Sequence, residues 1–321
     1  MQYTPVSKRT SEPDRDPRIY ADLDALVRLQ FEAQGFSFLP RQPVHSVLHG
    51  RHASRLRGRG LNFEELRNYV PGDDIRTVDW KATARTRKPQ VRVYTEERDR
   101  PVWLIVNQRQ SMFFGSRVCM KSVTAAEITA LAAWRVLGAG DRVGAMVFND
   151  QEIVTIPPRR SRHQVMRILG AVVRMGHALS STGGTAPNAG MLNEVLRQLQ
   201  PQATHDCLIC LVGDGSGVDS ETIGRVTPLT AHNDLLFALV YDPAEAELPA
   251  VGPLAATDGQ RYLALDTSDP RFLSGLARDF KQGLETIQAL SRRHTVPLFT
   301  LRTDRPVPEQ LRAQLGAAGR N

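Results

Sequence analysis

Side chains with oxygen donors stand at separate points of the sequence, in segments rich in small and polar residues. Ser111 lies shortly after an apolar run that ends at Val106, and Asp214 follows a run that ends at Val212. Thr185 lies between these two points. Hydroxyl and carboxylate oxygens are the ligands that a hard divalent cation such as Mg²⁺ takes in proteins. If the fold brings the three residues together, they form a candidate binding site.

Other short motifs give little support for catalysis. The segment Gly213–Gly217 places its serine one position out of register for the G-x-S-x-G turn of hydrolases, and no histidine is visibly paired with it. Gly183–Thr185 lacks the lysine of a phosphate-binding P-loop. Cys207 and Cys210 have C-x-x-C spacing, but positions three apart in a strand point to opposite faces. We interpret the three cysteines as free thiols, not as metal ligands or a redox pair.

A regular alternation of apolar strands and amphipathic helices begins near residue 100. We predict strands at Val102–Val106, Arg142–Phe148, Glu152–Ile156, Leu208–Val212, Leu235–Tyr241 and Val296–Leu301. Helices are predicted at Lys121–Leu137, Arg162–Val173, Ala189–Leu199 and Pro270–Arg293. Continuous apolar strands alternating with helices are typical of a mostly parallel sheet buried on both faces. The predicted fold is α/β: a doubly wound, Rossmann-like sheet with an antiparallel hairpin near one edge.

This predicted layout indicates where the oxygen donors lie in the fold. Open α/β sheets bind ligands at the carboxyl ends of their strands, near the point where the strand order reverses. We therefore expect Asn107–Ser111, the segment around Thr185 and the segment after Val212 to converge at one edge of the sheet.

The first hundred residues have a different character. Residues 1–19 are polar and charged without a secretory hydrophobic core, and we interpret them as a disordered leader. A short amphipathic helix is predicted over Tyr20–Gln34 and a half-exposed strand over Gln90–Glu96. With 41% hydrophobic residues, a net charge of +7 and no apolar run of bilayer length, we expect a cytoplasmic protein without a membrane span.

A basic arm, residues 41–59, lies in a stretch with no acidic residue between Glu32 and Glu64. Its cationic and imidazole side chains are Arg41, His45, His49, Arg51, His52, Arg55, Arg57 and Arg59. Such a cluster meets phosphate in some proteins and acidic side chains in others. Aromatic residues make up only 6% of the chain and are almost absent here, so stacking on nucleic-acid bases is poorly supported. The neighbouring arginines also disfavour a metal site on His45 and His49.

The turn Pro71–Asp74 opens a segment dense in acids and arginines. We expect Asp73, Asp74, Arg76, Asp79, Arg85 and Arg92 to form a web of arginine–carboxylate pairs. Phe63 and Trp80 would anchor that web on the α/β domain. The alternative is a nuclease-like cluster of Asp73, Asp74 and Asp79, but the interspersed arginines would neutralise the carboxylates that a metal needs.

Three stretches together resemble the prokaryotic family called domain of unknown function 58. They are Leu61–Tyr94, Gly115–Phe148, and Tyr241–Pro243 with Glu247–Pro249. Within the first, the signature residues are Phe63, Arg67, Tyr69, Pro71, Gly72, Asp73, Asp74, Arg76, Asp79, Trp80 and Arg85. The resemblance extends from about residue 18 onward. Members look like von Willebrand factor A domains and are typically encoded beside MoxR-type AAA+ ATPases, which implies a role as ATPase partner or adaptor in complex assembly or chaperone-like activation.

The family's metal loop usually has the pattern D-x-S-x-S, and this chain departs from it. The matching positions are Asn107, Arg109 and Ser111. Asn107 lacks the negative charge, and Arg109 places a cation near the metal, where a pair of like unit charges 4 Å apart costs about 4 kcal/mol at an effective dielectric of about 20. We therefore expect no cofactor, with Mg²⁺ disfavoured. Our hypothesis is that the Arg109 guanidinium takes the cation's place and pairs with Asp214; the alternative is that Arg109 points to solvent.

These observations predict residues 20–98 as an N-terminal accessory segment and 99–321 as a von Willebrand factor A-like domain. The predicted function is a non-catalytic protein-binding module with a degenerate metal-ion-dependent adhesion site formed by Asn107, Arg109, Ser111, Thr185 and Asp214. The expected partner is a MoxR-type AAA+ ATPase, and we do not expect nucleic acid. The rival hypothesis is a nucleic-acid-binding or hydrolytic protein that uses the basic arm and the acids of the Pro71–Asp74 turn.

Overall fold

The computed structural model describes residues 15–33, 61–71, 73, 75–96, 100–182, 186–257 and 262–318. The chain divides into two compact units, which are described separately below. The described parts of the α/β unit are residues 15–33 and 100–318, and those of the hairpin unit are residues 61–96. In these described ranges, no helix combines the length and the apolar character needed to cross a membrane.

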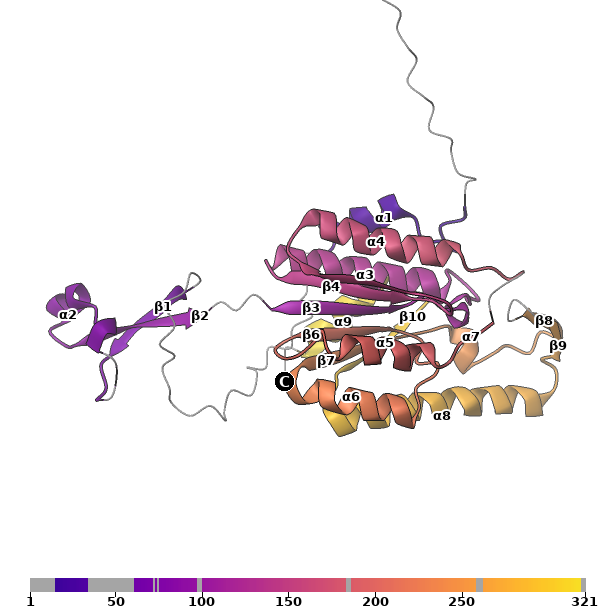
Figure 1. Ribbon diagram of the computed structural model, residues 1–321. Coiled ribbons are helices and arrows are strands. Elements are labelled where there is room, and N and C mark those ends of the chain that lie inside the picture. Colours follow the sequence, from indigo (N-terminus) through magenta and orange to yellow (C-terminus); the bar gives the residue numbers. More distant parts are fainter. Residues whose placement is uncertain are drawn as a thin grey trace, which may run out of the picture. The chain divides into compact units, whose positions relative to one another are not determined.

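A six-stranded sheet forms the centre of the α/β unit (Figure 1). Its strands are β3 (Pro101–Asn107), β4 (Arg142–Phe148), β5 (Ile153–Arg159), β6 (Leu208–Gly213), β7 (Asp234–Tyr241) and β10 (Leu298–Arg302). They lie in the order β10-β7-β6-β3-β4-β5, and every pair is parallel except β4 with β5. The predicted doubly wound, mostly parallel sheet with an antiparallel hairpin at one edge is confirmed.

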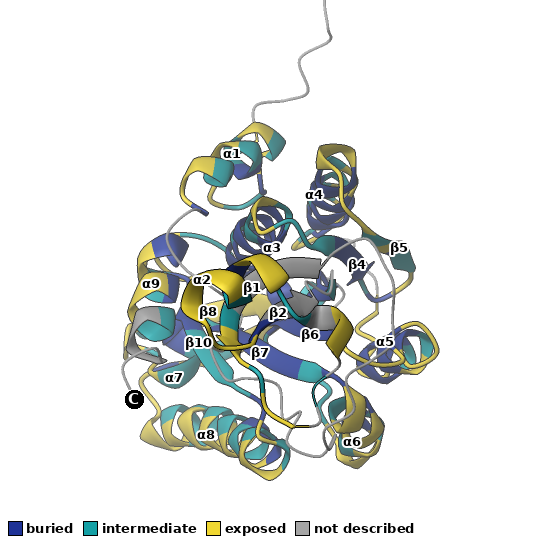
Figure 2. Ribbon diagram, turned by 90° about the vertical axis from the view of Figure 1, so that its left-hand side faces the viewer, coloured by how far each residue is buried: buried dark blue, intermediate teal, exposed yellow. Residues whose placement is uncertain are grey.

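Helices cover both faces of the sheet. Those of the unit are α1 (Leu23–Arg28), α3 (Lys121–Gly138), α4 (Arg162–His177), α5 (Met191–Leu199), α6 (Ser220–His232), α7 (Pro243–Ala246), α8 (Pro270–His294) and α9 (Val307–Ala318). Alternate residues of β3 enter two different cores: Leu104 packs with the residues of α3 and α4, whereas Ile105 packs with those of α5, α6 and α8. Because both faces of the central strands β3, β4, β6 and β7 are buried, these strands appear in the sequence as nearly continuous apolar runs. Figure 2 shows this buried centre within more exposed helices.

The chain order places a switch point between β3 and β6. From β3 the chain moves to β4 and β5 on one side, then returns to β6 on the other side of β3. The loops that leave the carboxyl ends of β3 and β6 therefore diverge, and they leave room for side chains between them.

The N-terminal segment belongs to the α/β unit. The predicted helix Tyr20–Gln34 is present as α1 followed by a 3₁₀ turn, η1 (Leu29–Phe31). Leu26 is buried against α3 and α4, and its carbonyl oxygen accepts a hydrogen bond of 3.1 Å from Trp134 Nε1. The predicted accessory segment is thus divided, because the apolar face of this helix finds its partners on the α/β unit. We call residues 16–33 the strap.

The hairpin unit has two antiparallel strands, β1 (Leu61–Asn68) and β2 (Gln90–Glu96), joined through η3 (Ile75–Thr77) and α2 (Trp80–Thr86). The predicted strand Gln90–Glu96 is confirmed. The Asp79 carboxylate caps α2 by accepting hydrogen bonds from the backbone of Lys81 and Ala82. Such a cap satisfies amide groups that have no partner within the helix.

Our prediction omits α6, α9 and an antiparallel hairpin formed by β8 (Pro253–Thr257) and β9 (Tyr262–Asp266). Helix α6 contains Pro228 and buries only a narrow stripe, so its apolar periodicity is weak. Helix α9 completes the β10 edge of the sheet. The side-chain amides of Gln310 and Gln314 exchange hydrogen bonds with the backbone of Thr300 and Arg302. These two glutamines therefore bond the backbone N–H and C=O groups at the edge of β10, which would otherwise be open to pairing with another strand.

Candidate functional site

Two of the three predicted loops meet at the switch point. Asn107, the last residue of β3, donates a hydrogen bond of 3.1 Å from Nδ2 to Oδ1 of Asp214, which follows β6. A Cβ atom on Gly213 would lie 2.9 Å from the Cβ of Asn107, so glycine permits this approach. The convergence expected for these loops is confirmed.

The third loop also reaches this point, although Thr185 itself lies outside the described residues. Its described part, 186–190, lies against the loop after β6. Gly217 has a φ of +83°, and a Cβ atom there would collide with the carbonyl oxygen of Ala189. A residue with a side chain would therefore force these two loops apart.

Arg109 ties the three loops together. Its Nη1 donates to the carbonyl oxygen of Asn188 at 3.1 Å, its Nη2 donates to that of Ser216, and its Nε donates to Oδ1 of Asn107 at 3.1 Å. The side chain is only 3% exposed, so the alternative in which it points to solvent is wrong. Burial lowers the pKa of Arg109, and the negative charges of Asp214 and Asp150 oppose that effect.

The expected ion pair between Arg109 and Asp214 is also wrong, because the guanidinium is used on backbone carbonyl oxygens. The cation that pairs with Asp214 is Lys121, the first residue of α3, with an Nζ–Oδ2 distance of 3.5 Å. Lys121 is 3% exposed, and its Nζ also lies 2.5 Å from Oε1 of Glu245 on α7. A lysine at the start of an apolar helix carries no sequence signal for this role, because its two partners lie far along the chain.

Charge and burial act in opposite directions on this cluster. Burial disfavours the carboxylate of Asp214, but the positive charges of Lys121 and Arg109 outweigh it and hold the pKa of Asp214 below its usual value. Burial likewise disfavours the Lys121 ammonium, but the charges of Asp214 and Glu245 raise its pKa. Both groups are therefore charged at neutral pH.

Two further aspartates, absent from our predicted site, organise the loops. Asp150 accepts backbone hydrogen bonds from Gln110 at 2.6 Å and from Asn188 at 2.7 Å, which joins the first loop to the second. Asp242 is fully buried and accepts hydrogen bonds from the backbone and hydroxyl of Ser116 and from the hydroxyl of Thr303. Asp242 belongs to the Tyr241–Pro243 motif, so that motif holds the loop before α3 in place.

The carboxylate of Asp214, the charged oxygen donor of the predicted site, is already engaged by several partners. Asp214 also accepts from the backbone N–H and the hydroxyl of Ser216, in addition to Asn107 and Lys121. The Ser111 hydroxyl is buried and makes no hydrogen bond, although its proximity helps to lower the pKa of Asp214. Within the ranges that the structure describes, no three His, Cys, Asp or Glu side chains gather as metal ligands would. Two cations beside one carboxylate disfavour a divalent metal at these residues.

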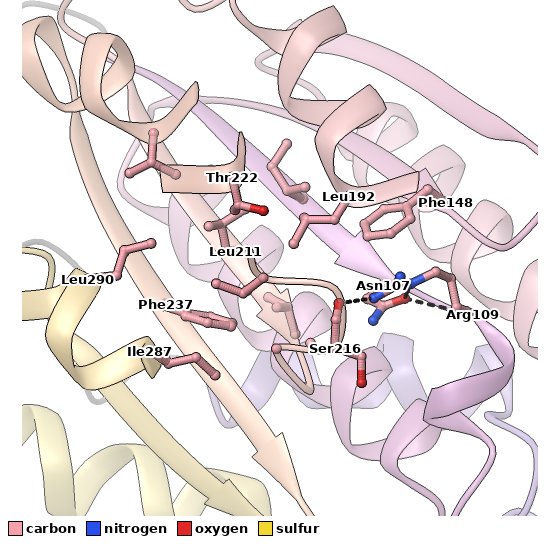
Figure 3. Close-up of a pocket in the computed structure, with 16 residues that line it drawn as sticks. Asn107, Arg109, Phe148, Leu192, Leu211, Ser216, Thr222, Phe237, Ile287 and Leu290 are labelled. Atoms are coloured by element: carbon pink, nitrogen blue, oxygen red, sulfur yellow. Dashed lines mark hydrogen bonds between the residues drawn. The ribbon is translucent and has the colours of Figure 1, made fainter. Parts of the chain in front are cut away.

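A small apolar pocket extends from this cluster between the sheet and helices α5, α6 and α8. Figure 3 shows Asn107, Arg109 and Ser216 at one end and Phe237, Ile287 and Leu290 at the other. Most of the side chains that line it are aliphatic or aromatic, so it offers few groups for orienting a polar substrate.

Of the carboxylates in the predicted arginine–carboxylate web, Asp73 is paired with an arginine, but the partner is Arg67, which the prediction did not place in the web. Arg67 makes a bidentate pair with Asp73, with nitrogen–oxygen distances of 2.8 and 2.7 Å, and Asp73 also accepts the backbone N–H of Val70. The hydrogen bond from Arg67 lowers the pKa of Asp73. Tyr69 is half-buried, whereas Pro71, Arg76, Trp80 and Arg85 are exposed. Gly72, Asp74, the side chains of Phe63 and Arg92, and the basic arm lie outside the described residues.

Comparison with known proteins gives a family but no activity. The model of the family described as "Protein of unknown function DUF58" matches residues 65–293. The uncharacterized proteins Rv1480 of Mycobacterium tuberculosis and Mb1516 of Mycobacterium bovis are each 30% identical over 269 residues, which cover 83% of this chain and 82% of theirs.

Two solved structures are also similar. The conserved hypothetical protein BatB from Bacteroides thetaiotaomicron is 15% identical, with a TM-score of 0.39, and the match covers 69% of this chain and 100% of that one. An aerotolerance-related membrane protein from Bacteroides fragilis is 13% identical, with a TM-score of 0.40, and the match covers 68% of this chain and 99% of that one.

Proposed function

The chain belongs to the family of proteins of unknown function DUF58, and from that premise we propose that it is a non-catalytic, protein-binding module of the von Willebrand factor A type. Its docking surface is the rim, which we define as residues 107–120, 186–190 and 214–219. The rim surrounds the carboxyl ends of β3 and β6, where open α/β sheets bind their ligands.

The observation that carries this proposal is the state of Arg109. In a metal-dependent site a divalent cation would join the loops, whereas here a buried guanidinium bonds to carbonyl oxygens of two loops and to Asn107. The loops are therefore held in one arrangement by the chain itself. A preorganised surface loses less conformational entropy on binding, which favours recognition of a protein partner.

The rim also presents apolar side chains to solvent. Phe114 is 42% exposed and Val118 is 51% exposed, and both lie between η4 (Gln110–Met112) and α3. The Lys121 ammonium lies over the Phe114 ring, 5.9 Å from its centroid, and this cation–π contact stabilises the position of the ring. Exposed aromatic residues on a rigid base are typical of the energetic centres of interfaces.

The partner that we propose is an AAA+ ATPase of the MoxR type, on the basis of the family resemblance. In this proposal the protein is an adaptor that presents the ATPase to a client. The rival function, nucleic-acid binding or hydrolysis through the acids of the hairpin unit, gains no support from the described residues. Asp73 is paired with Arg67, and Asp79 caps α2.

The test is a binding titration of the full chain with a MoxR-type ATPase from the same organism. Phe114→Ser with Val118→Ser should weaken binding at least about tenfold, as expected for loss of an apolar interface centre. Phe31→Ser is the matched control, because Phe31 is 72% exposed on η1, outside the rim. Equal binding by the rim variant and the control would refute the rim as the docking surface, and retention on DNA that falls steeply with salt would favour the rival.

A further inference from the structure

Two exposed apolar surfaces remain without a role, and the first carries positive charge. In the hairpin unit, Val70, Ile75 and Trp80 are 56%, 67% and 71% exposed. The cations that accompany them on and just after α2 are exposed as well: Lys81, Arg85, Arg87 and Lys88. We call these seven residues the basic patch.

The second group carries negative charge and lies on the β8–β9 hairpin and the segment just before it, with Tyr262 and Leu263 on opposite faces of β9. Val251, Leu254, Tyr262 and Leu263 are 61%, 38%, 72% and 61% exposed. Exposed carboxylates beside them come from Glu247 and Asp266. We call these six residues the acidic patch. From Asp242 to Asp269 the sequence contains a single basic residue, Arg261.

Neither surface is supported by a core of its own. Every described side chain of β8 is exposed, and so is nearly every one of β9. A two-stranded hairpin without packing is only marginally stable in water. Among the side chains described in the hairpin unit, only Ala82, Gln90 and Val91 are buried. Large exposed apolar side chains grouped on small elements of this kind are typical of interaction surfaces.

We propose that the basic patch of one copy docks on the acidic patch of a second copy of this chain. Each patch combines large apolar side chains with charges opposite to those of the other, so both burial and electrostatics favour the contact. This proposal does not depend on the ATPase.

The connectivity favours a second copy over the same copy. Residues 97–99 join the hairpin unit to the start of β3, at the amino end of the sheet, whereas β8 and β9 follow α7 beyond the carboxyl end (Figure 1). A strand of seven residues such as β3 spans roughly 23 Å. Within one copy the hairpin unit is therefore tethered at one end of β3 and the acidic patch lies beyond the other end, whereas a second copy has no such tether.

Because the two patches differ, the contact is head-to-tail. An open assembly of this kind keeps one unused basic patch at one end and one unused acidic patch at the other, so association continues to closed rings or open chains. Salt weakens it, because the charged groups lie at the surface.

Complementation between two defective variants tests this geometry. Full chains carrying Trp80→Ser or Tyr262→Ser are analysed by analytical ultracentrifugation, alone and mixed, beside the wild type and Phe31→Ser. For the wild type and for Phe31→Ser we expect the mass of the sedimenting species to increase with protein concentration. Each patch variant alone should sediment as a monomer. An equimolar mixture of the two patch variants should form a 1:1 dimer that grows no further, because only one pair of intact patches remains.

A charge exchange gives a second readout. Lys81→Glu with Arg85→Glu should raise the dissociation constant at least about tenfold, and mixing with a chain that carries Glu247→Lys and Asp266→Lys should restore association. Unchanged far-ultraviolet circular dichroism shows that each variant is folded. A wild type that stays monomeric at all concentrations, or folded patch variants that associate like the wild type, would overturn the proposal.

Discussion

At the scale of single residues, Lys121 controls the charge balance beneath the rim. A carboxylate and an ammonium that are both buried lose most of their hydration, and this loss is offset only when the partners are close and well bonded. The Asp214 carboxylate accepts hydrogen bonds from Lys121, from Asn107 and from the backbone N–H and hydroxyl of Ser216. These bonds meet the condition. Removing the ammonium would leave buried negative charge without compensation.

We predict that Lys121→Met lowers the free energy of unfolding at pH 7 by about 3–5 kcal/mol, the usual cost of breaking a buried pair. The pKa of Asp214 is held below its usual value, so its stabilising contribution is present above pH about 4 and is lost as pH falls below it. The difference in the free energy of unfolding between wild type and Lys121→Met should therefore become smaller at acidic pH. Urea denaturation at pH 7 and below pH 4 measures it.

Lys281→Met is the matched control, because the Lys281 side chain is 76% exposed. A surface lysine of this kind contributes at most about 1 kcal/mol. If Lys121→Met lowers the free energy of unfolding no more than the control does, the buried cation has no structural role.

A second prediction at this scale concerns metal. Because Arg109 and Lys121 lie beside Asp214, we predict that Mg²⁺ and Mn²⁺ in the millimolar range leave the melting temperature unchanged in a thermal-shift titration. Asp214→Ala is titrated in parallel. Stabilisation of the wild type by either ion, abolished in Asp214→Ala, would show that the site accepts a divalent cation after all.

At the scale of elements, the strap links the amino-terminal residues to the rim. The backbone N–H of Met120, next to α3, donates to the carbonyl oxygen of Arg18 at 2.9 Å, and the Tyr20 hydroxyl donates to the carbonyl oxygen of Leu179 at 3.2 Å. The Tyr20 ring also lies 5.8 Å from that of Phe113. The strap thus holds the loops that follow η4 and α4.

A charged residue of the strap also contributes to the titration of Glu127 on α3. Burial raises the pKa of this carboxyl to about 7, and the negative charge of Glu32, just after η1, adds to the effect. Between the unfolded pKa near 4.5 and the folded value near 7, the folded state binds the extra proton. Stability is therefore lost as pH rises through this window.

We predict that Glu127→Gln removes this pH dependence and stabilises the protein at pH 8 by roughly 2–4 kcal/mol, the free-energy equivalent of the pKa shift. Thermal or urea unfolding between pH 5 and pH 8 measures it. Glu285→Gln serves as the control, since the Glu285 side chain is 61% exposed. If Glu127→Gln and wild type show parallel stability profiles over this range, Glu127 does not titrate there.

At the scale of the whole molecule, the α/β unit is formed by the parts of the chain that come before and after the hairpin unit in the sequence. The strap packs on α3 and α4, while the sheet is formed entirely by residues after 100. Fold and docking rim therefore reside in one unit, and the hairpin unit is an insertion between the strap and β3.

We predict that replacing residues 36–98 with a flexible Gly/Ser linker of about 20 residues leaves a cooperatively folding α/β unit, since none of the described residues of the removed segment belongs to its core clusters. Calorimetry should show a single transition near that of the full chain. Deleting residues 1–33 from the excised protein should lower this transition, because Trp134 and the core around Leu26 become exposed. Loss of cooperative unfolding after excision would mean that the insertion is required for folding.

The sequence by itself determined the sheet and the positions of its functional loops. The apolar runs of β3, β4 and β6 are long enough and continuous enough to specify buried strands, because strands covered on both faces have no polar side. Once these strands are parallel, Asn107 and Asp214 must emerge at the same edge. The same patterns missed α6 and β8–β9, whose side chains are little buried and therefore leave no strong periodicity.

The tertiary structure alone decided which groups pair within the site. Arg109 and Lys121 are both cations near Asp214, and nothing in their spacing shows that the first bonds to carbonyl oxygens while the second pairs with the carboxylate. Glu245 and Asp150 are likewise distant in the chain from the groups that they contact. Such pairings depend on distances of a few ångströms and on desolvation, which arise only when the elements pack.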